Sequence, residues 1–288
     1  MRIGIAVKHG LADAAETLAA IELWLASHAV DSSWEPAAAA LLPPGERRIV
    51  ERAELPRDAD LVMVLGGDGT LLALAKAIAE ADRDIPILAV NFGSLGFLTE
   101  ITRPEISASL DAVLAGTAEH DQRMMLRAVA HRAGAPPSTH WALNDIVFTR
   151  TALSRMIDLA VWVGDQFVAS VKADGLIVAS PTGSTAYNLA AGGPIVHPAM
   201  DALVLTPIAP HTLTNRPIVI PAERDVRVKS TGANAGNIYV TFDGQSGFEM
   251  QEGDEIAIAR APRPLRLVRS SARSYFEVLR QKLKWNER

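Results

Sequence analysis

The stretch LVMVLGGDGTLLALAK, residues 61–76, joins a short apolar run to a glycine loop and then to a segment rich in Ala and Leu. A continuous apolar run of this length is typical of a strand buried on both faces of a parallel sheet. The segment after Thr70 favours a helix over residues 71–81 because Ala and Leu are strong helix formers. The order of strand, glycine loop and helix therefore predicts an α/β domain.

The same alternation continues on both sides of this stretch. Short apolar runs predict strands at residues 2–7 and 87–91, and helical spacing predicts helices at 12–26 and 104–114. Alternating strands and helices favour an open parallel sheet. We therefore predict a Rossmann-like α/β domain over residues 1–121.

The pattern changes near residue 122, after which short strands separated by turn residues follow one another. The predicted strands are 126–131, 145–149, 157–163, 175–179, 204–207, 218–220, 226–229, 238–242 and 256–259. Only residues 185–191 favour a helix in this region. We predict a C-terminal β-sandwich domain over residues 122–268. A last predicted helix at 275–283 leads us to expect that segment 269–288 rejoins the first domain.

Composition limits the classes of protein that the chain can belong to. The net charge is −5 and 21% of residues are charged, so the basic excess typical of a nucleic-acid binder is absent. The chain has no cysteine, which excludes disulfides and thiolate metal sites. The first apolar run is too short for a signal peptide, and no stretch approaches the roughly 18 apolar residues of a membrane span. We expect a cytoplasmic protein with no nucleic-acid or membrane partner.

The glycine loop at residues 66–70 has the features of a phosphate-binding site. Gly66, Gly67 and Gly69 allow positive φ angles and a close approach of the backbone to a ligand. The following helix offers free N–H groups at its start, where Thr70 can act as the N-cap. Asp68 stands at the centre, and a carboxylate beside phosphate holds a metal ion or accepts a proton. The alternative is a hairpin turn, which the helix-forming segment that follows disfavours.

Several common nucleotide-binding and metal-binding motifs are absent. The sequence contains no G-x-x-x-x-G-K-[ST], no G-x-G-x-x-G and no H-E-x-x-H. The loop is therefore neither a P-loop nor the usual dinucleotide fingerprint. Any phosphate must be held by the glycine backbone together with a metal ion from solution, and we expect no metal site made by the protein alone.

Other stretches have polar or aromatic groups where a nucleotide could bind. Phe97 follows a second glycine loop and can offer its ring to a base, although a core position is the alternative. Asn144 suits an adenine edge and Asp145 a pair of ribose hydroxyls, whereas a capped turn explains both equally well. The hydroxyl-rich segment 182–185 suits phosphate or amide recognition, and Tyr187 adds a stacking face. A helix N-cap is the alternative there.

Taken together, these stretches resemble a known family. The GGDGT loop is similar to that of a superfamily that includes NAD kinases, diacylglycerol-type lipid kinases and 6-phosphofructokinases. The segments NFGSLGFLT (91–99), ND (144–145) and DGLIVASPTGSTAYN (174–188) resemble NAD kinase signatures, as do GGP (192–194), TPIAPH (206–211) and DGQ (243–245). The resemblance covers about residues 61–245.

The resemblance implies a function and a set of site residues. An NAD kinase transfers the terminal phosphate of ATP, or of another donor, to the 2′-hydroxyl of the adenosine ribose of NAD, and gives NADP. It implies Asp68 as the catalytic base, Mg²⁺ that arrives with the donor, and a homo-oligomer, either dimer or tetramer. The residues expected to bind the nucleotides are Gly66, Gly67, Gly69, Phe97, Asn144, Asp145, Arg155, Lys172, Asp174, Thr182, Thr185, Ala186, Tyr187, Asn188, Leu189, Ala190 and Gln245.

One position departs from the family pattern, and two other functions stay open. NAD kinases often have a basic residue five positions after the catalytic aspartate, where this chain has Ala73, and Lys76 is a candidate substitute. A lipid or sugar kinase could use the same loop, although the 144–145 and 182–187 motifs oppose it. An NAD(P)-binding regulator without activity is disfavoured by the intact Asp68. The donor and the choice between NAD and NADH stay undetermined.

Overall fold

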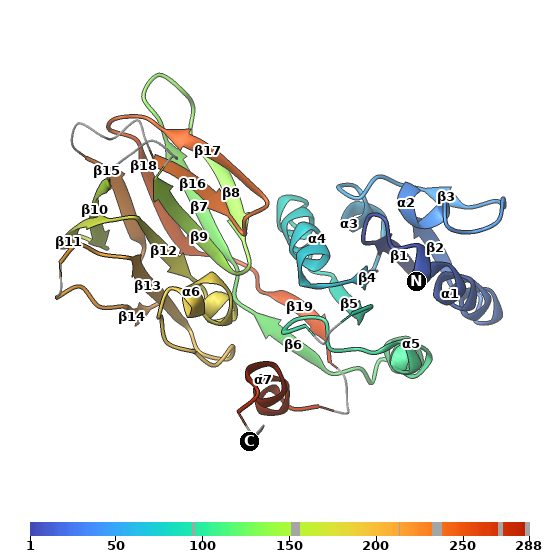
Figure 1. Ribbon diagram of the computed structural model, residues 1–288. Coiled ribbons are helices and arrows are strands. Elements are labelled where there is room, and N and C mark those ends of the chain that lie inside the picture. The colour runs from blue at the N-terminus through green and yellow to red at the C-terminus, as the bar shows by residue number, and fades with distance from the viewer. Residues whose placement is uncertain (94–95, 151–155, 213, 232–237, 270–272, 286–288) are drawn as a thin grey trace. The chain divides into compact units, whose positions relative to one another are not determined.

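The chain divides into two compact units, which are described separately (Figure 1). The computed structural model describes residues 1–93, 96–150, 156–212, 214–231, 238–269 and 273–285. The first unit comprises Met1–Gln122 and Leu265–Arg288, and the second comprises Arg123–Pro264.

The first unit is built on a seven-stranded sheet with the order β3-β2-β1-β4-β5-β19-β6. The paired strands from β3 to β19 run parallel. Their bounds are β1 Arg2–Val7, β2 Asp31–Trp34, β3 Arg48–Ile49, β4 Leu61–Gly66, β5 Pro86–Asn91, β19 Leu265–Val268 and β6 His120–Arg123. The α/β fold predicted for this part of the chain is confirmed.

Helices cover this sheet because its central strands are apolar on both faces. Every residue of β4 is buried, and so are five of the six residues of β1 and of β5. One core cluster joins α1 (Ala15–Ser27) and α5 (Ile106–Leu114) to side chains from these three strands. The remaining helices of the unit are α2 (Pro36–Ala39), α3 (Leu55–Asp58), α4 (Asp68–Glu80) and α7 (Tyr275–Leu283), with 3₁₀ turns η1 (Ala12–Ala14) and η2 (Arg103–Glu105).

Two expectations for the first unit were wrong in detail. Helix α4 begins at Asp68, three residues before the predicted start, and its N-cap is Gly67, so Thr70 lies inside the helix and does not cap it. Strand β19 pairs with β5, which places residues 265–268 in the first sheet and not in the second domain. Residues 265–268 belong to the first sheet because they pair with β5, which is distant in sequence, and no local sequence pattern predicts that pairing.

The second unit consists of two six-stranded antiparallel sheets. Their orders are β11-β10-β15-β18-β7-β8 and β14-β13-β12-β9-β16-β17. One core cluster contains side chains from both sheets, among them Leu159 and Val228 of one sheet and Phe148 and Val240 of the other. This arrangement confirms the predicted sandwich. The strands are β7 Leu126–His131, β8 Ser138–Ala142, β9 Asp145–Arg150, β10 Ile157–Val163, β11 Gln166–Ala173, β12 Gly175–Ala179, β13 Ala202–Ile208, β14 Ile218–Pro221, β15 Val226–Ser230, β16 Ile238–Phe242, β17 Ser246–Met250 and β18 Glu255–Arg260.

The helix predicted at residues 185–191 is split into two short pieces. The 3₁₀ turn η3 covers Thr182–Thr185, and α6 covers Tyr187–Ala190. Ala186 separates them with φ −90° and ψ −132°, which is not helical. Gly192 then ends the segment with φ +84°, a conformation that favours glycine.

Candidate active site

The glycine loop joins the carboxyl end of β4 to the first turn of α4. Gly66 is closely surrounded, because a Cβ there would lie 2.9 Å from both the Lys8 Cβ and the Thr70 Oγ1. Gly67 and Gly69 are open, with nothing within 4 Å of where their Cβ atoms would be. The expected positive φ angles are not found at these glycines. Gly66 is needed because no side chain fits at that position, whereas Gly67 and Gly69 leave the backbone uncovered.

The start of α4 presents free donors on this bare backbone. The N–H of Thr70 bonds to the carbonyl of Gly67 at 3.0 Å. Within the described part of the chain, the N–H groups of Asp68 and Gly69 donate to no backbone carbonyl. Unpaired N–H groups at the positive end of a helix dipole attract anions. The loop therefore has the chemistry expected of a phosphate cradle.

The Asp68 side chain is held by the second glycine loop, not by its own loop. Its Oδ2 accepts a hydrogen bond from the N–H of Phe97 at 2.9 Å. Its Oδ1 accepts from the N–H of Leu98 at 3.3 Å and from Thr99, whose N–H and hydroxyl lie at 3.1 and 3.0 Å. The Phe97 ring faces the amine of Lys282 in α7, at 5.7 Å from the ring centre. The structure thus joins two motifs that lie about thirty residues apart in the sequence.

The second unit contains a pocket of about 290 Å³ that brings several predicted residues together. Asn144, Asp145 and Thr149 line it from β9 and the residue before it, and Ala186 and Tyr187 line it from the junction of η3 with α6. Val147, Thr241, Asp243 and Gly244 complete the lining. Tyr187 is 45% exposed, so its ring is available to a ligand.

Two carboxylates of this pocket lie in an environment that disfavours their charge. Burial, with the neighbouring Asp243 carboxylate as the second cause, raises the pKa of Asp145 to about 7. Burial also raises the pKa of Asp243, although three hydrogen bonds from the backbone N–H groups of residues 143–145 oppose that shift. Those bonds measure 2.7, 2.7 and 3.1 Å. Because Asp243 has these donors, we assign the negative charge of the pair to Asp243 and, below about pH 7, the proton to Asp145.

Asp243 has two roles in the structure. Asp243 and Gly244 have φ angles of 52° and 62°, as expected for the turn between β16 and β17. The carboxylate also binds the backbone that carries Asn144 and Asp145. Asp243 and the backbone that it binds are about one hundred residues apart in the sequence. No local pattern therefore indicates this contact, and the DGQ motif is its only signal in the sequence.

The TGST segment packs directly on the Asn144 backbone. A Cβ at Gly183 would overlap the Asn144 carbonyl, and Ser180 donates its N–H to the same carbonyl at 2.8 Å. Thr182 is buried, and its hydroxyl has no hydrogen-bond partner among the described residues. Asn188 is fully buried, and its amide bonds to Ser184, Pro194 and Thr206. The Asn188 side chain therefore stabilises this segment from within.

The other predicted binding residues do not line this pocket. Lys172 pairs with Asp158 at 3.6 Å, and Asp174 pairs with Arg150 at 3.4 Å. The hydroxyl of Thr185 donates to the Thr182 carbonyl at 3.3 Å. Leu189, Ala190 and Gln245 are partly or fully exposed, and Arg155 lies outside the described residues.

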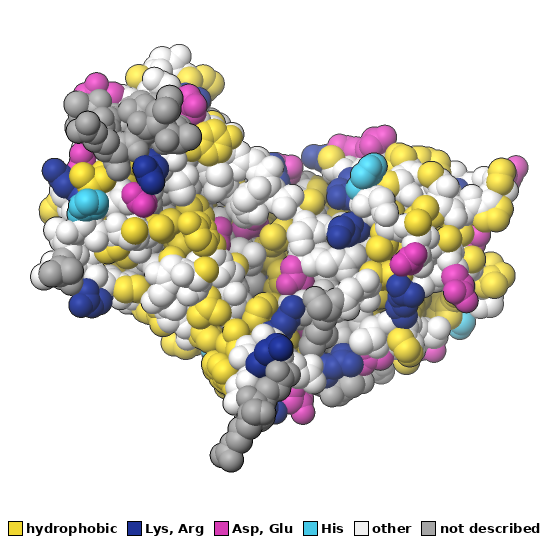
Figure 2. Space-filling view, viewed as in Figure 1, with side chains coloured by type: hydrophobic (Ala, Val, Ile, Leu, Met, Phe, Trp, Pro, Cys, Tyr) yellow, Lys and Arg dark blue, Asp and Glu magenta, His cyan; other side chains and the backbone are white. Residues whose placement is uncertain are grey.

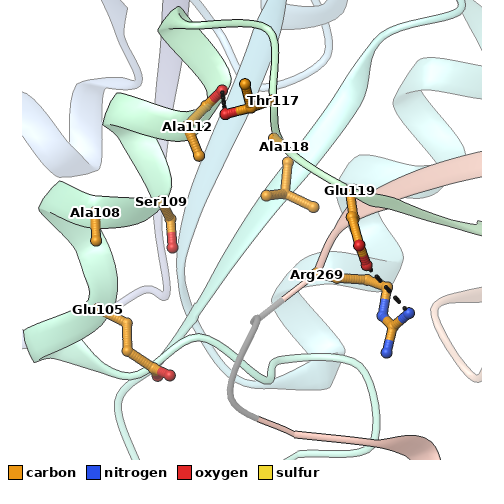
Figure 3. A pocket seen from close by; sticks show the side chains of 9 residues that line it. Glu105, Ala108, Ser109, Ala112, Thr117, Ala118, Glu119 and Arg269 are labelled. Carbon is orange, nitrogen blue, oxygen red and sulfur yellow. Dashed lines mark hydrogen bonds and ion pairs between the residues drawn. The ribbon is translucent and has the colours of Figure 1, made fainter.

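A separate cavity of about 230 Å³ lies in the first unit and contains none of the predicted site residues (Figure 3). Residues of α5 and the segment after it line one side, and Val268 and Arg269 line the other. Arg269 pairs with Glu119 at 3.5 Å across its rim. Across the described residues there is no cluster of three or more acidic or histidine side chains that could hold a metal ion. No helix in the same residues is long and apolar enough to cross a membrane.

Comparison with known proteins decides the family. The model of the ATP-NAD kinase N-terminal domain matches residues 3–118, and that of the ATP-NAD kinase C-terminal domain matches residues 143–270. The chain belongs to the NAD kinase family. The NAD kinase of Geotalea daltonii is 52% identical over 238 residues, which cover 83% of each chain. That of Syntrophotalea carbinolica is 43% identical over 287 residues, which cover 100% of this chain and 99% of the relative.

Solved structures of NAD kinases have the same fold. Yeast NADH kinase complexed with NADH matches with a TM-score of 0.90 at 25% identity, over 100% of this chain and 89% of the yeast chain. An NAD kinase from Archaeoglobus fulgidus in complex with ATP matches with a TM-score of 0.77 at 26% identity, over 99% of both chains. The fold and family expected from the signatures are therefore confirmed.

Proposed function

We propose that this chain transfers the terminal phosphate of ATP to the 2′-hydroxyl of the adenosine ribose of NAD, giving NADP, with Asp68 as the base. The observation that carries the proposal is the position of Asp68. It is the first residue of α4, in a loop where Gly67 and Gly69 leave the backbone open to a phosphate. Membership of the NAD kinase family supports both substrates.

The reaction needs one proton transfer and one displacement. The 2′-oxygen attacks the terminal phosphorus while its proton passes to the Asp68 carboxylate. The bond between that phosphorus and the bridging oxygen breaks, and ADP leaves with the electron pair. Phosphoryl transfer depends mainly on positioning and on stabilising charge. The free N–H groups at the start of α4 are suited to stabilising the charge on the transferred phosphate.

Magnesium belongs to this proposal as a companion of the donor. Three of the four hydrogen bonds that Asp68 accepts go to Oδ1, and in the proposed reaction the free site of Oδ2 is taken by the 2′-hydroxyl, which leaves no site for a metal ion. Mg²⁺ retains several waters and usually binds through substrate phosphates with one or two carboxylates. When bound, it neutralises the charge that develops on the transferred phosphate. We therefore assign the metal to the ATP phosphates.

We assign the dinucleotide to the pocket of the second unit. Asn144 and Asp145 offer hydrogen-bonding groups, Tyr187 offers an exposed ring, and the three lie around one cavity. The other residues predicted to bind the nucleotides, among them Lys172 and Asp174, are also proposed to contact the dinucleotide. Their present ion pairs are largely exposed, and such pairs are weak enough for a ligand to replace them.

We also propose that the enzyme is a homo-oligomer. Strands β11 and β14 are edge strands of the two sheets, and each exposes apolar side chains: Phe167 and Val168 on β11, and Ile218 and Val219 on β14. Hydrophobic side chains gather on the face of the second unit that carries β12 to β14 (Figure 2). Unpaired strand edges with apolar side chains favour association.

The test is an assay of the purified protein with ATP, Mg²⁺ and either NAD or NADH. We expect NADP to form from NAD, and the parallel reaction with NADH measures the preference between the two. Asp68→Asn keeps the size of the side chain but removes the base. Because general-base catalysis contributes about a hundredfold to ten-thousandfold, turnover should fall by that factor. Near-normal turnover of Asp68→Asn with an unchanged melting temperature contradicts the assignment of the base.

A further inference from the structure

The second glycine loop holds the Asp68 carboxylate with four donors from three consecutive residues. Phe97 donates its N–H to Oδ2 at 2.9 Å. Leu98 and Thr99 donate their N–H groups to Oδ1 at 3.3 and 3.1 Å, and the Thr99 hydroxyl adds a bond of 3.0 Å to the same oxygen. Thr99 is fully buried, so water cannot replace its hydroxyl easily. The orientation of the carboxylate is therefore fixed by a loop other than its own.

The two carboxylate oxygens are not equivalent in this arrangement. An ionised carboxylate has about two acceptor sites on each oxygen. Oδ1 already accepts from three donors, so it has no site left for a substrate. Oδ2 accepts from one donor among the described residues, so one of its sites is free. The difference arises because Thr99 contributes both of its donors to Oδ1.

Gly96 makes this close approach possible. A Cβ at this position would overlap both Asp68 Oδ1 and Thr99 Oγ1. Any side chain there would push the loop away from the carboxylate. Gly96 therefore allows the second loop to contact Asp68, whereas Gly67 and Gly69 leave the backbone beside Asp68 open.

We propose that Thr99 is a positioning residue for phosphoryl transfer: its buried hydroxyl fixes the orientation of the Asp68 carboxylate through Oδ1 and so presents Oδ2 to the 2′-hydroxyl of NAD. This inference rests on the proposed role of Asp68 as the base. The proton of the 2′-hydroxyl passes to Oδ2 as the 2′-oxygen bonds to phosphorus, and ADP leaves with the electrons of the broken bond. Thr99 itself neither gains nor loses a proton.

The test compares Thr99→Ser with Thr99→Ala. Both variants lack the methyl group, and only serine retains the hydroxyl, so the pair isolates the bond to Oδ1. A misplacement of about 1 Å can reduce a rate a hundredfold. We expect Thr99→Ala to lose about tenfold to a hundredfold in kcat, with KM for NAD and ATP within about twofold of the parent. Thr99→Ser should recover most of the loss, which a purely structural role does not predict.

A double variant separates this inference from the proposed function. If Thr99 acts through Asp68, adding Thr99→Ala to Asp68→Asn causes no further loss of turnover. An additional loss in the double variant, or equal kcat for the serine and alanine variants, overturns the positioning role. Normal turnover of Asp68→Asn alone instead overturns the base. Turnover is measured per folded molecule, with the melting temperature of each variant recorded alongside.

Discussion

Replacing Asp145 with asparagine should change how the stability of the protein depends on pH. Burial and the neighbouring Asp243 raise the pKa of Asp145 to about 7, from an ordinary value of 3.8. Between these two values the folded protein holds a proton that the unfolded chain has lost. Raising the pH through this window therefore favours the unfolded chain, and stability falls until the pH passes 7.

The magnitude follows from the width of the window. Each pKa unit corresponds to about 1.4 kcal/mol, so the whole window represents about 4 kcal/mol. Between about pH 5 and about pH 8 the wild type should lose about 3 kcal/mol through this group. The amide of the Asp145→Asn variant cannot titrate, so the variant lacks this loss. The two proteins should have similar stability at the lower pH, and the variant should be more stable at the higher one.

The assay is denaturant unfolding of the full chain at both pH values for wild type and Asp145→Asn. The quantity of interest is the difference between their pH dependences, in which the other titrating groups largely cancel. Asp243→Asn is a matched control in the same pocket. It replaces one of the two oxygens that accept these three backbone N–H bonds with an NH2 group, and should destabilise the protein at both pH values. Equal pH dependences for wild type and Asp145→Asn would refute the raised pKa.

Three further predictions concern the loop, the metal and the assembly. Gly69→Ala should raise KM for ATP without lowering the melting temperature, since a Cβ meets nothing within 4 Å and Ala favours the helix. Lys76→Ala should change that KM less than about twofold, because Lys76 lies eight residues, about 12 Å along the helix, after the start of α4. A fall in melting temperature with KM unchanged contradicts the open cradle. EDTA should stop turnover and leave the melting temperature unchanged, and a marked fall would reveal a structural metal. Val219→Lys, at an exposed position of edge strand β14, should lower the molar mass measured by light scattering. An unchanged mass argues against this edge as the interface.

The sequence predicted strands well where both faces are buried and poorly at sheet edges. The buried runs of β4 and β12 were placed almost to the residue. Strands β3, β6, β8, β11 and β17, each at the edge of its sheet, were not predicted. The inner strands β2 and β19 were missed as well, and of the edge strands only β14 was predicted. An edge strand such as β17 (Ser246–Met250) alternates polar and apolar residues weakly, because one side faces solvent. Its position is decided by pairing with β16, which no local pattern encodes.

The site shows the same division between local and distant information. The glycine loop and its aspartate could be recognised because strand, loop and helix follow one another in sequence. The donors to Asp68 come from residues 97–99, and the donors to Asp243 come from residues 143–145. Both contacts bring together segments that are far apart in the chain. Sequence reasoning therefore located the motifs and missed the hydrogen bonds that orient their carboxylates.

These contacts bear on how the loop can hold the charge of ATP without the basic residue that is frequent in the family. Ala73 offers no charge, and Lys76 lies about two turns into α4, eight residues after Asp68. Near the loop lie Lys8, whose Cβ is 2.9 Å from where a Cβ of Gly66 would be, and the N–H groups at the start of α4, which the bare glycines leave accessible. Backbone donors cannot be titrated or displaced, but each carries only a partial charge. The chain should therefore rely on Mg²⁺, together with Lys8, for most of the neutralisation, while the backbone fixes the direction from which the phosphate meets Asp68.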